Sequence, residues 1–362
     1  PVEFLPEEVT SHLHDENTDL LFITFSDGTS SEETIDAVRE IRELTGDSVK
    51  LGGMSSMVLD TMNLSEQEIF IYIIIAVILC IVVLELSLDS YLVPILLLAN
   101  IGIAILFNLG TNIFLGQISY ITKALVAVLQ LGVTTDFSIF LYHSYESKKD
   151  KYKDNNKAMA DAICETFTSV VGSSLTTIAG FLVLCTMKLT LGKDLGIVMA
   201  KGVLLGVICV LTLFPSLLLT FDKLIQKTKH KSLNLSFANL NNFIVKHHVT
   251  IFIIFLICLV PAYLGYKKID VYYKIDKSLP ETLESISTNN KLKDNYNIVS
   301  PEIILVDNNM KTNDIAAMTN ELKKVEGVDF VLSFDDLKQL GISENMLPEN
   351  LLKIFKSDKY EM

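Results

Sequence analysis

Long apolar stretches with few charges alternate with short polar segments along most of this chain. Six of the stretches reach or approach the roughly 20 residues that a helix needs to cross a bilayer. They lie at residues 69–86, 91–109, 118–142, 166–187, 195–221 and 249–266. The pattern therefore predicts a polytopic α-helical membrane protein with six transmembrane helices.

The two ends of the chain carry a different pattern, in which short apolar runs are separated by turn residues. In the first end, residues 20–25 are predicted to form a strand, Ser30 and Glu33 a capping box that starts a helix, and Val49 a second strand. Gly46 is predicted to end the helix. This order of strand, helix and strand predicts an α+β segment.

The second end repeats that order. A strand is predicted at residues 303–306, followed by a helix that is capped by Thr312 or Asn313 and ends at Gly327, and then by a strand at 330–334. The recurrence of one βαβ unit on both sides of a set of apolar helices indicates an internal duplication.

Lysines in the short loops orient the predicted helices. The loops after the third and fifth stretches are rich in lysine, whereas loops 110–117 and 188–194 contain only Lys188 and Lys193. Because cytoplasmic loops carry the excess of positive charge, we expect a multi-pass protein of the cell membrane with these lysine-rich loops in the cytoplasm and both terminal segments outside. The segment 222–246 mixes apolar and basic residues and is predicted to be a cytoplasmic amphipathic linker.

Composition agrees with a membrane protein and narrows its partners. Half of the residues are hydrophobic (50%), and the net charge of −13 belongs mostly to the polar ends, so it does not indicate a nucleic-acid partner. The five cysteines form no CxxC motif and no metal-ligand spacing. We therefore predict no cofactor, no metal site and no nucleic acid, and we expect the lipid bilayer as a partner.

Asp136 is an aspartate well inside a predicted span, where insertion scales put the cost of a charge at about 2.5 to 3.5 kcal/mol. It must be paired, hydrated or protonated. Ser173, Ser174, Thr176 and Thr177 on the next predicted helix are expected at a similar depth. Hydroxyls stabilise the charged form of a carboxylate, and dehydration favours its protonated form. We therefore interpret the acid as a proton relay rather than as a structural tie between helices.

The segment 132–141 reads Gly-Val-Thr-Thr-Asp-Phe-Ser-Ile-Phe-Leu. It resembles the fourth-helix signature of resistance-nodulation-division (RND) transporters of the mycobacterial-membrane-protein-large (MMPL) type. Segment 173–181, which reads Ser-Ser-Leu-Thr-Thr-Ile-Ala-Gly-Phe, resembles the fifth helix of that family, and segment 194–217 resembles the sixth. Phe137 departs from the tyrosine that is usual after the acid.

The resemblance implies a domain order. Residues 1–66 would end a first extracytoplasmic porter domain, 67–221 would be transmembrane helices 2–6, 222–246 the cytoplasmic linker, 247–266 helix 7, and 267–362 the start of a second porter domain of ferredoxin-like type. Such transporters have twelve spans, so the resemblance implies a missing second half with helices 8–12 as a partner. We therefore expect the chain to be a piece of a longer protein.

The resemblance also implies a function that is not enzymatic, namely proton-motive-force-driven export of lipid-like, hydrophobic or amphiphilic substrates. The predicted proton relay consists of one acid and five neighbouring hydroxyls: Asp136, Thr135, Ser173, Ser174, Thr176 and Thr177. The sequence assigns no substrate-binding residues and leaves a homo-oligomer open.

Three alternatives use the same helices. One is a lipid-sensing or sterol-sensing module, and another is a protein-translocation accessory of the same superfamily. The third is an intramembrane aspartyl protease, which needs two apposed aspartates. The residues Val-Thr-Thr before Asp136 are unlike the Gly-x-Gly-Asp type of protease motif.

Other polar and small residues receive structural interpretations. Lys201 is expected to extend toward the membrane surface, and Asn108 to hydrogen-bond between helices. The spacing Gly202-x-x-x-Gly206 predicts close packing of two helices. Asp89, in the turn between the first two spans, is expected to be hydrated.

Overall fold

The computed structural model describes residues 14–15, 18–149, 151–152, 154–231, 238–269, 279–299, 302–307, 309–329, 331, 333 and 360–361. The chain divides into two compact units. The end unit comprises Pro1–Thr61 and Tyr273–Met362, and the helical unit comprises Met62–Tyr272. The boundary after Thr61 falls within one long helix, α3 (Met54–Ser87).

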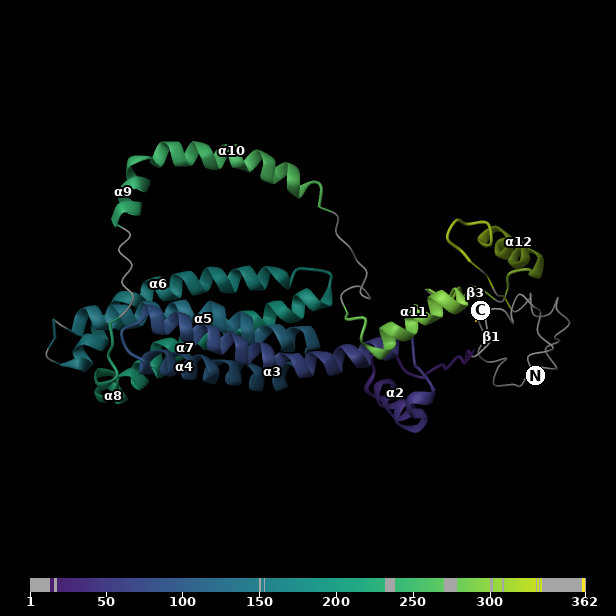
Figure 1. The fold of residues 1–362 in the computed structure, drawn as a ribbon, viewed down its shortest axis with the longest axis horizontal. Coiled ribbons are helices and arrows are strands. Elements are labelled where there is room, and N and C mark those ends of the chain that lie inside the picture. The colour runs from purple at the N-terminus through teal and green to yellow at the C-terminus, as the bar shows by residue number, and fades with distance from the viewer. Residues whose placement is uncertain are drawn as a thin grey trace. The chain divides into compact units, whose positions relative to one another are not determined.

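Six helices in the described part of the chain are long and apolar enough to cross a membrane (Figure 1). They are α3, α4 (Leu92–Gly110) with the 3₁₀ turn η3 (Thr111–Leu115), α5 (Tyr120–Lys149), α6 (Asn155–Leu184), α7 (Thr190–Thr220) and α10 (His248–Tyr266). Each overlaps one of the six predicted stretches. The prediction of a polytopic α-helical membrane protein is therefore confirmed.

Two shorter helices lie between α7 and α10. Helix α8 (Asp222–Lys227) follows α7 after a single residue, and α9 (Ala238–Lys246) precedes α10, from which His247 separates it. Both fall within the predicted amphipathic linker. Residues 232–237 of that linker lie outside the described residues.

The core of the helical unit lies between α4, α5, α6 and α7, which run side by side in Figure 1. Its largest buried side chains include Leu97 of α4, Leu141 and Tyr142 of α5, and Phe214 of α7. Helix α3 contributes through its second half, where Leu84 is buried. The other helices of the bundle therefore pack around α5 and α7.

Glycines allow α7 to approach its neighbours closely. A Cβ atom on Gly206 would lie 2.1 Å from Thr134 Cγ2 of α5, and one on Gly202 would lie 2.4 Å from Asn108 Nδ2 of α4. Because lipid is itself apolar, membrane helices associate through close van der Waals packing at small residues and through polar contacts. The packing role predicted for these two glycines is confirmed.

Besides the start of α3, the described residues of the end unit form three α-helices and two short antiparallel strand pairs. The helices are α2 (Glu32–Thr45), followed by the 3₁₀ turn η2 (Gly46–Ser48), α11 (Glu284–Tyr296) and α12 (Thr312–Leu322). The strand pairs are β1 (His14–Asp15) with β2 (Thr18–Asp19), and β3 (Val306–Asp307) with β4 (Tyr360–Glu361). Helix α11 is an addition to the predicted elements, because its polar sequence carries no apolar stripe.

Several strands predicted in the end unit are wrong. Residues 20–25 form no strand, and Leu21 and Phe22 are 78% and 67% exposed. A strand needs a neighbour for its backbone hydrogen bonds, and the described residues place none beside this run. Val49 also lies outside any strand, and the strand predicted at 303–306 reduces to β3.

The two helices predicted for the end unit are confirmed with small shifts. The N-cap of α2 is Ser31 rather than Ser30, and its hydroxyl accepts a backbone N–H at 3.2 Å. Gly46 ends α2 with φ 56, a conformation that costs glycine little. Helix α12 runs from Thr312 to Leu322 with Lys311 as its N-cap, so its cap lies one or two residues before the predicted one and its end lies before Gly327. Most of the strand predicted at 330–334 lies outside the described residues.

An ion pair between Arg42 of α2 and Asp60 of α3 connects three segments of the end unit. The two side chains are 19% and 8% exposed, and Arg42 donates hydrogen bonds of 2.5 and 3.2 Å to the carboxylate. Asp60 also accepts the backbone N–H of Ser285 in α11 at 2.9 Å, across 225 residues of sequence. The pair therefore joins α2 and α3 to the distant α11.

A second acid strengthens this cluster. Glu284 lies 3.7 Å from Arg42 Nε. Burial by itself would lower the pKa of Arg42, but the hydrogen bond to Asp60 and the charges of Asp60 and Glu284 raise it above its ordinary value. Arg42 therefore remains charged under all ordinary conditions.

We expect Asp60→Asn to loosen the end unit. The change leaves Arg42 largely buried without its main counter-charge, and loss of one partner of such a pair costs about 3 kcal/mol. Hydrogen–deuterium exchange in α2 and α11 measures the loss. Asp36→Asn is the control, because the Asp36–Arg39 pair is exposed and contributes at most a few tenths of a kcal/mol. Equal exchange in the two variants would contradict the structural role of Asp60.

We expect Gly206→Ala to destabilise the helical unit by about 1 to 3 kcal/mol, because the added methyl group forces α5 and α7 apart. Thermal unfolding in detergent, followed by circular dichroism, measures the change. Gly180→Ala in α6 is the matched control, since a Cβ atom there meets no atom within 4 Å. A Gly206 variant as stable as the control would show that the close approach is not needed.

Candidate proton-relay site

Asp136 lies on the exposed face of α5. Gly132 and Phe140, four residues before and after it, are exposed as well, whereas Thr134 is fully buried. Residues three or four apart share one face of a helix. Asp136 therefore belongs to an exposed stripe that also includes Leu129, and the buried face of α5 points the other way.

Two contacts between α5 and α6 set the level of Asp136. Ser144 Oγ donates to Glu165 at 3.0 Å, and Lys148 pairs with Asp161. The helices are antiparallel with the same rise per residue. Eight residues separate Asp136 from Ser144, and the same number separates Glu165 from Ser173. Asp136 and Ser173 therefore lie at the same level.

The five hydroxyls predicted to serve Asp136 each donate to a carbonyl of their own helix. The hydrogen bonds range from 2.5 Å for Thr135 to 3.2 Å for Ser173, with Thr176, Ser174 and Thr177 between them. Ser173 and Thr176 are exposed and Ser174 is buried. For the Asp136 side chain, the described part of the chain supplies neither a hydrogen bond nor an ion pair. Asp136 and Ser173 thus lie at the same depth along their helices, and the carboxylate forms no hydrogen bond to any of the five hydroxyls.

This arrangement leaves the hydroxyls chemically available. A hydroxyl that donates to its own helix keeps both acceptor lone pairs and can rotate to donate elsewhere. A carboxylate on an exposed face can gain or lose a proton when water or a partner group reaches it. Among the described residues, no group of three or more His, Cys, Asp or Glu side chains could hold a metal ion.

A second polar group lies inside the bundle, on the buried face of α5. Asn108 Nδ2 donates to Gln130 Oε1 at 2.9 Å, and Gln130 Nε2 donates to the Gly202 carbonyl at 3.1 Å. Lys201 Nζ donates to the Asn108 carbonyl at 3.0 Å and to Asn112 Oδ1. We call these residues the interior amide network. The interhelical role predicted for Asn108 is confirmed.

Sequence reasoning missed two members of this network, Gln130 and Asn112. Gln130 is fully buried and Asn112 is 7% exposed. The available signal was the rarity of amides in apolar helices, where an unpaired polar group is costly. Lys201 was expected to extend to the surface, but it is held by Asn108 and Asn112 instead.

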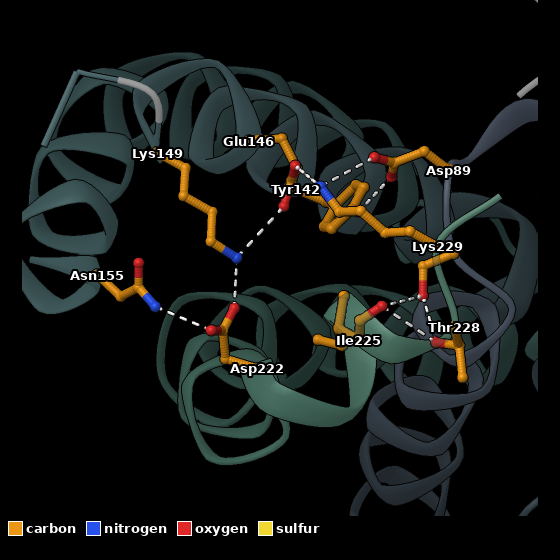
Figure 2. A network of polar contacts seen from close by, with 10 residues as sticks. Asp89, Tyr142, Glu146, Lys149, Asn155, Asp222, Ile225, Thr228 and Lys229 are labelled. Atoms are coloured by element: carbon orange, nitrogen blue, oxygen red, sulfur yellow. Dashed lines mark hydrogen bonds and ion pairs between the residues drawn. The ribbon is translucent and has the colours of Figure 1, made fainter. Parts of the chain in front are cut away.

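A third polar group, the end network, lies at the lysine-rich end of the helical unit (Figure 2). The Tyr142 hydroxyl donates to Asp89, and Lys229 Nζ lies 3.4 Å from Asp89 and 2.9 Å from Glu146. Lys149 pairs with Asp222. The network also includes Ser90, Asn155 and Thr228.

The end network fixes one end of the bundle. It joins the turn between α3 and α4 to α5, to the start of α6 and to the segment that follows α7. The expectation that Asp89 is simply hydrated is wrong, because its side chain is 33% exposed and bonded to two side chains. This contact could not be predicted from local sequence, since Asp89 and Lys229 are far apart in the chain.

Two charges of this network titrate away from their ordinary values. Burial by itself would raise the pKa of Asp89, but the hydrogen bond from Tyr142 and the charge of Lys229 bring it below its ordinary value of 3.8. Burial would lower the pKa of Lys229, but its hydrogen bond to Glu146 and the charges of Glu146 and Asp89 raise it. Each group thus stabilises the charged form of the other.

Comparison with known families identifies the helical unit. The family model described as the MMPL family matches residues 15–247, which is more than half of the chain. The matched region includes α2 to α9, and therefore Asp136, the hydroxyls of α6, the interior amide network and the end network.

Several curated proteins resemble parts of the chain. It is 34% identical over 120 residues to the membrane protein ActII-3 of Streptomyces coelicolor, a match that covers 33% of this chain and 17% of that protein. It is 28% identical over 197 residues to the "Probable transport protein MmpL4" of Mycobacterium leprae, with coverage of 52% and 20%. It is 26% identical over 208 residues to the siderophore exporter MmpL5 of Mycobacterium tuberculosis, with coverage of 54% and 22%. The chain thus spans about a fifth of these relatives.

We expect Asp89→Asn to lower stability at neutral pH by about 1 to 2 kcal/mol, because it removes charge-assisted hydrogen bonds from a partly buried site. Since the pKa of Asp89 is lowered in the folded protein, its contribution is present above the unfolded value and is lost as the pH falls through the folded value. Thermal unfolding of both proteins across pH measures the difference. It should be constant at pH values well above the unfolded pKa of Asp89 and should diminish as the pH falls through the lowered pKa of the folded protein. A difference that persists unchanged in acid would contradict the assigned charge of Asp89.

Proposed function

The chain belongs to the MMPL family, and on that premise we propose that it forms part of a proton-driven membrane transporter in which Asp136 carries the proton. Its relatives include proteins named as transporters or exporters, and six helices of the chain are suited to a membrane. Both findings support a transport protein of the RND type.

One observation carries the role of Asp136. It is a carboxylate near the middle of a membrane helix, on an exposed face, and the described residues offer it no counter-charge. Three lysines at the lysine-rich end of the same unit, Lys148, Lys149 and Lys229, have carboxylate partners. An acid that the rest of the unit leaves unpaired suits reversible protonation better than helix attachment.

The hydroxyls of α6 support the same role. Ser173 shares the level of Asp136, and Thr176 and Thr177 lie one turn further along α6. These hydroxyls and Thr135 would stabilise the charged carboxylate by rotating toward it, and Ser174 would remain in the helix packing. Loss of the proton then costs less than in bare hydrocarbon.

Movement of protons through the membrane potential would supply the free energy for export. One charge moved through 100 mV provides about 2.3 kcal/mol. Protonation also removes the cost of exposing the Asp136 charge to apolar surroundings, so the two protonation states favour different surroundings for α5. We infer that this difference drives the rearrangement that exports a hydrophobic or amphiphilic substrate.

The exposed stripe around Asp136 is a suitable packing surface for further helices of a complete transporter. We propose that a second bundle, containing helices 8–12 of a complete transporter, packs against it. In this arrangement the lysine-rich end of the bundle faces the cytoplasm, residues 222–246 lie along the inner surface, and residues 1–66 and 267–362 belong to ferredoxin-like porter domains outside. The positive-inside rule supports this orientation.

Replacement of the acid tests the proposal. We expect Asp136→Asn to abolish gradient-driven export of an amphiphile from cells or proteoliposomes, because the amide cannot be ionised, while leaving the folded protein intact. Glu66→Gln is the control, because Glu66 is an exposed acid of α3 that lies 3.8 Å from Lys123, and it should export normally. Continued export by Asp136→Asn would overturn the coupling role and favour a lipid-sensing or translocation-accessory module.

A further inference from the structure

Lys201 has only neutral partners, which distinguishes it from four other lysines of the helical unit. Lys123, Lys148, Lys149 and Lys229 each lie within ion-pair distance of a carboxylate. Lys201 donates instead to the Asn108 carbonyl and to Asn112 Oδ1, and the described residues place no carboxylate beside it. A positive charge within a membrane helix is costly unless something compensates for it.

The neighbours of Lys201 have hydrogen-bonding capacity left over. A lysine ammonium carries three donors, and two of them are used. The lysine fixes the orientation of the Asn112 amide, because its oxygen must face the ammonium. The Asn112 Nδ2 group is therefore a donor, and it is buried with no partner among the described residues. The unused N–H donors of Lys201 and Asn112, next to the ammonium charge, would be satisfied best by an anionic acceptor.

One acceptor in the same network also lacks a partner. Asn108 is fully buried, and its Oδ1 has no hydrogen bond within the described part of the chain. A group that combines a charged acceptor with a hydroxyl, such as a phosphate monoester, would satisfy both kinds of atom. An ordered water bound with a carboxylate would do the same.

An apolar stripe on α7 leads away from Lys201. Leu204 and Ile208 are 52% and 49% exposed, and they lie three and seven residues after Lys201, so all three share one face of the helix. Lys201 itself is partly exposed. The stripe offers a surface for a hydrocarbon chain whose charged end reaches Lys201, with the neighbouring Asn112 donor close by.

This site is separate from Asp136. Gln130 contacts Gly202, and Thr134 contacts Gly206, so α5 and α7 run parallel with a constant offset. On that register Asp136 lies level with Ile208, and Lys201 lies seven residues away, or about 10 Å along the axis. Asp136 is exposed, whereas Gln130, six residues earlier on α5, is fully buried. The head group of a ligand at Lys201 is therefore about two helical turns from the level of Asp136.

We propose that Lys201 and Asn112 form a binding site for the anionic head group of an amphiphile, with its tail along Leu204 and Ile208. The proposal rests on the proposed transport function in one respect, because it assigns a negative charge to the transported class. In the orientation proposed above, the site faces the extracytoplasmic side of the bundle.

Binding of dodecyl phosphate to the protein in phosphatidylcholine nanodiscs tests the site. We expect Lys201→Gln, which keeps a donor for Asn108 or Asn112 but loses the charge, to weaken binding about tenfold or more. Lys201→Arg should retain most of the affinity if the site recognises charge. Lys123→Gln should bind as the unchanged protein does, because Lys123 is exposed and paired with Glu66.

The other probes separate the possible ligands. Dodecyltrimethylammonium, which has the same tail and the opposite charge, should bind equally to the Lys201→Gln variant and to the unchanged protein. Inorganic phosphate should bind much more weakly than dodecyl phosphate. If phosphatidylglycerol in the nanodisc displaces dodecyl phosphate, the anionic site is supported with a bilayer lipid as its occupant. If it does not, the site is supported for a single-chain amphiphile.

Two results would overturn the proposal. One is equal affinity of the Lys201→Gln variant and the unchanged protein for dodecyl phosphate, and the other is binding of inorganic phosphate as tight as that of dodecyl phosphate. Asp136→Asn should bind dodecyl phosphate normally. Failure of the anion site and failure of proton coupling are therefore distinguishable, because the first is measured by binding and the second by export.

Discussion

The cost of an uncompensated charge among membrane helices governs how this chain arranges its polar residues. At the lysine-rich end, the end network pairs Asp89, Glu146 and Asp222 with Lys229 and Lys149. Deeper in the bundle, amides replace acids: Asn108 donates to Gln130, and Gln130 donates to the backbone carbonyl of Gly202. The end network and the interior amide network hold the helices in a fixed arrangement. Asp136 and Lys201 differ from them, because the described residues offer neither side chain an opposite charge.

The close packing of the bundle has a functional consequence. Gly202 and Gly206 bring α7 against α4 and α5, so the buried face of α5 has little freedom to rearrange. The opposite face, which carries Asp136, is exposed. Changes in protonation therefore act on the side of α5 that is free to meet other surroundings, while the packed side keeps the helix in position.

Helix α3 links this bundle to the end unit. It runs from Met54 to Ser87 without a glycine or proline, the residues at which helices usually kink. The Arg42–Asp60 pair attaches its first turns to α2 and α11. The start of α3 is therefore fixed within the end unit by the same ion pair that holds α2 and α11.

The sequence was most informative where a strong periodic or compositional signal existed. The six apolar stretches and the glycine spacing on α7 follow from local composition, and the structure agrees. The strands at 20–25 and 303–306 failed as predictions because strand formation depends on a partner that local sequence cannot supply. Helix α11 was missed because its polar sequence lacks the apolar periodicity that marks an amphipathic helix.

The residues of the candidate sites also differ in whether they could be recognised from local sequence. Asp136 was visible in the sequence because an acid in an apolar run is rare, and its level beside Ser173 followed from counting along two helices. The end network and the partners of Lys201 were invisible, because they join residues from distant parts of the chain. Side-chain contacts between helices depend on their rotation and register, which one sequence does not encode locally.

The account stands on the claim that Asp136 binds and releases a proton in the folded protein. Infrared difference spectroscopy of the protein in lipid, recorded as the pH is changed, measures this directly through the carboxyl C=O stretch. The account predicts a band that appears on acidification, disappears reversibly on return to alkaline pH, and is absent from Asp136→Asn. A spectrum in which Asp136→Asn removes no pH-dependent carboxyl band would contradict it.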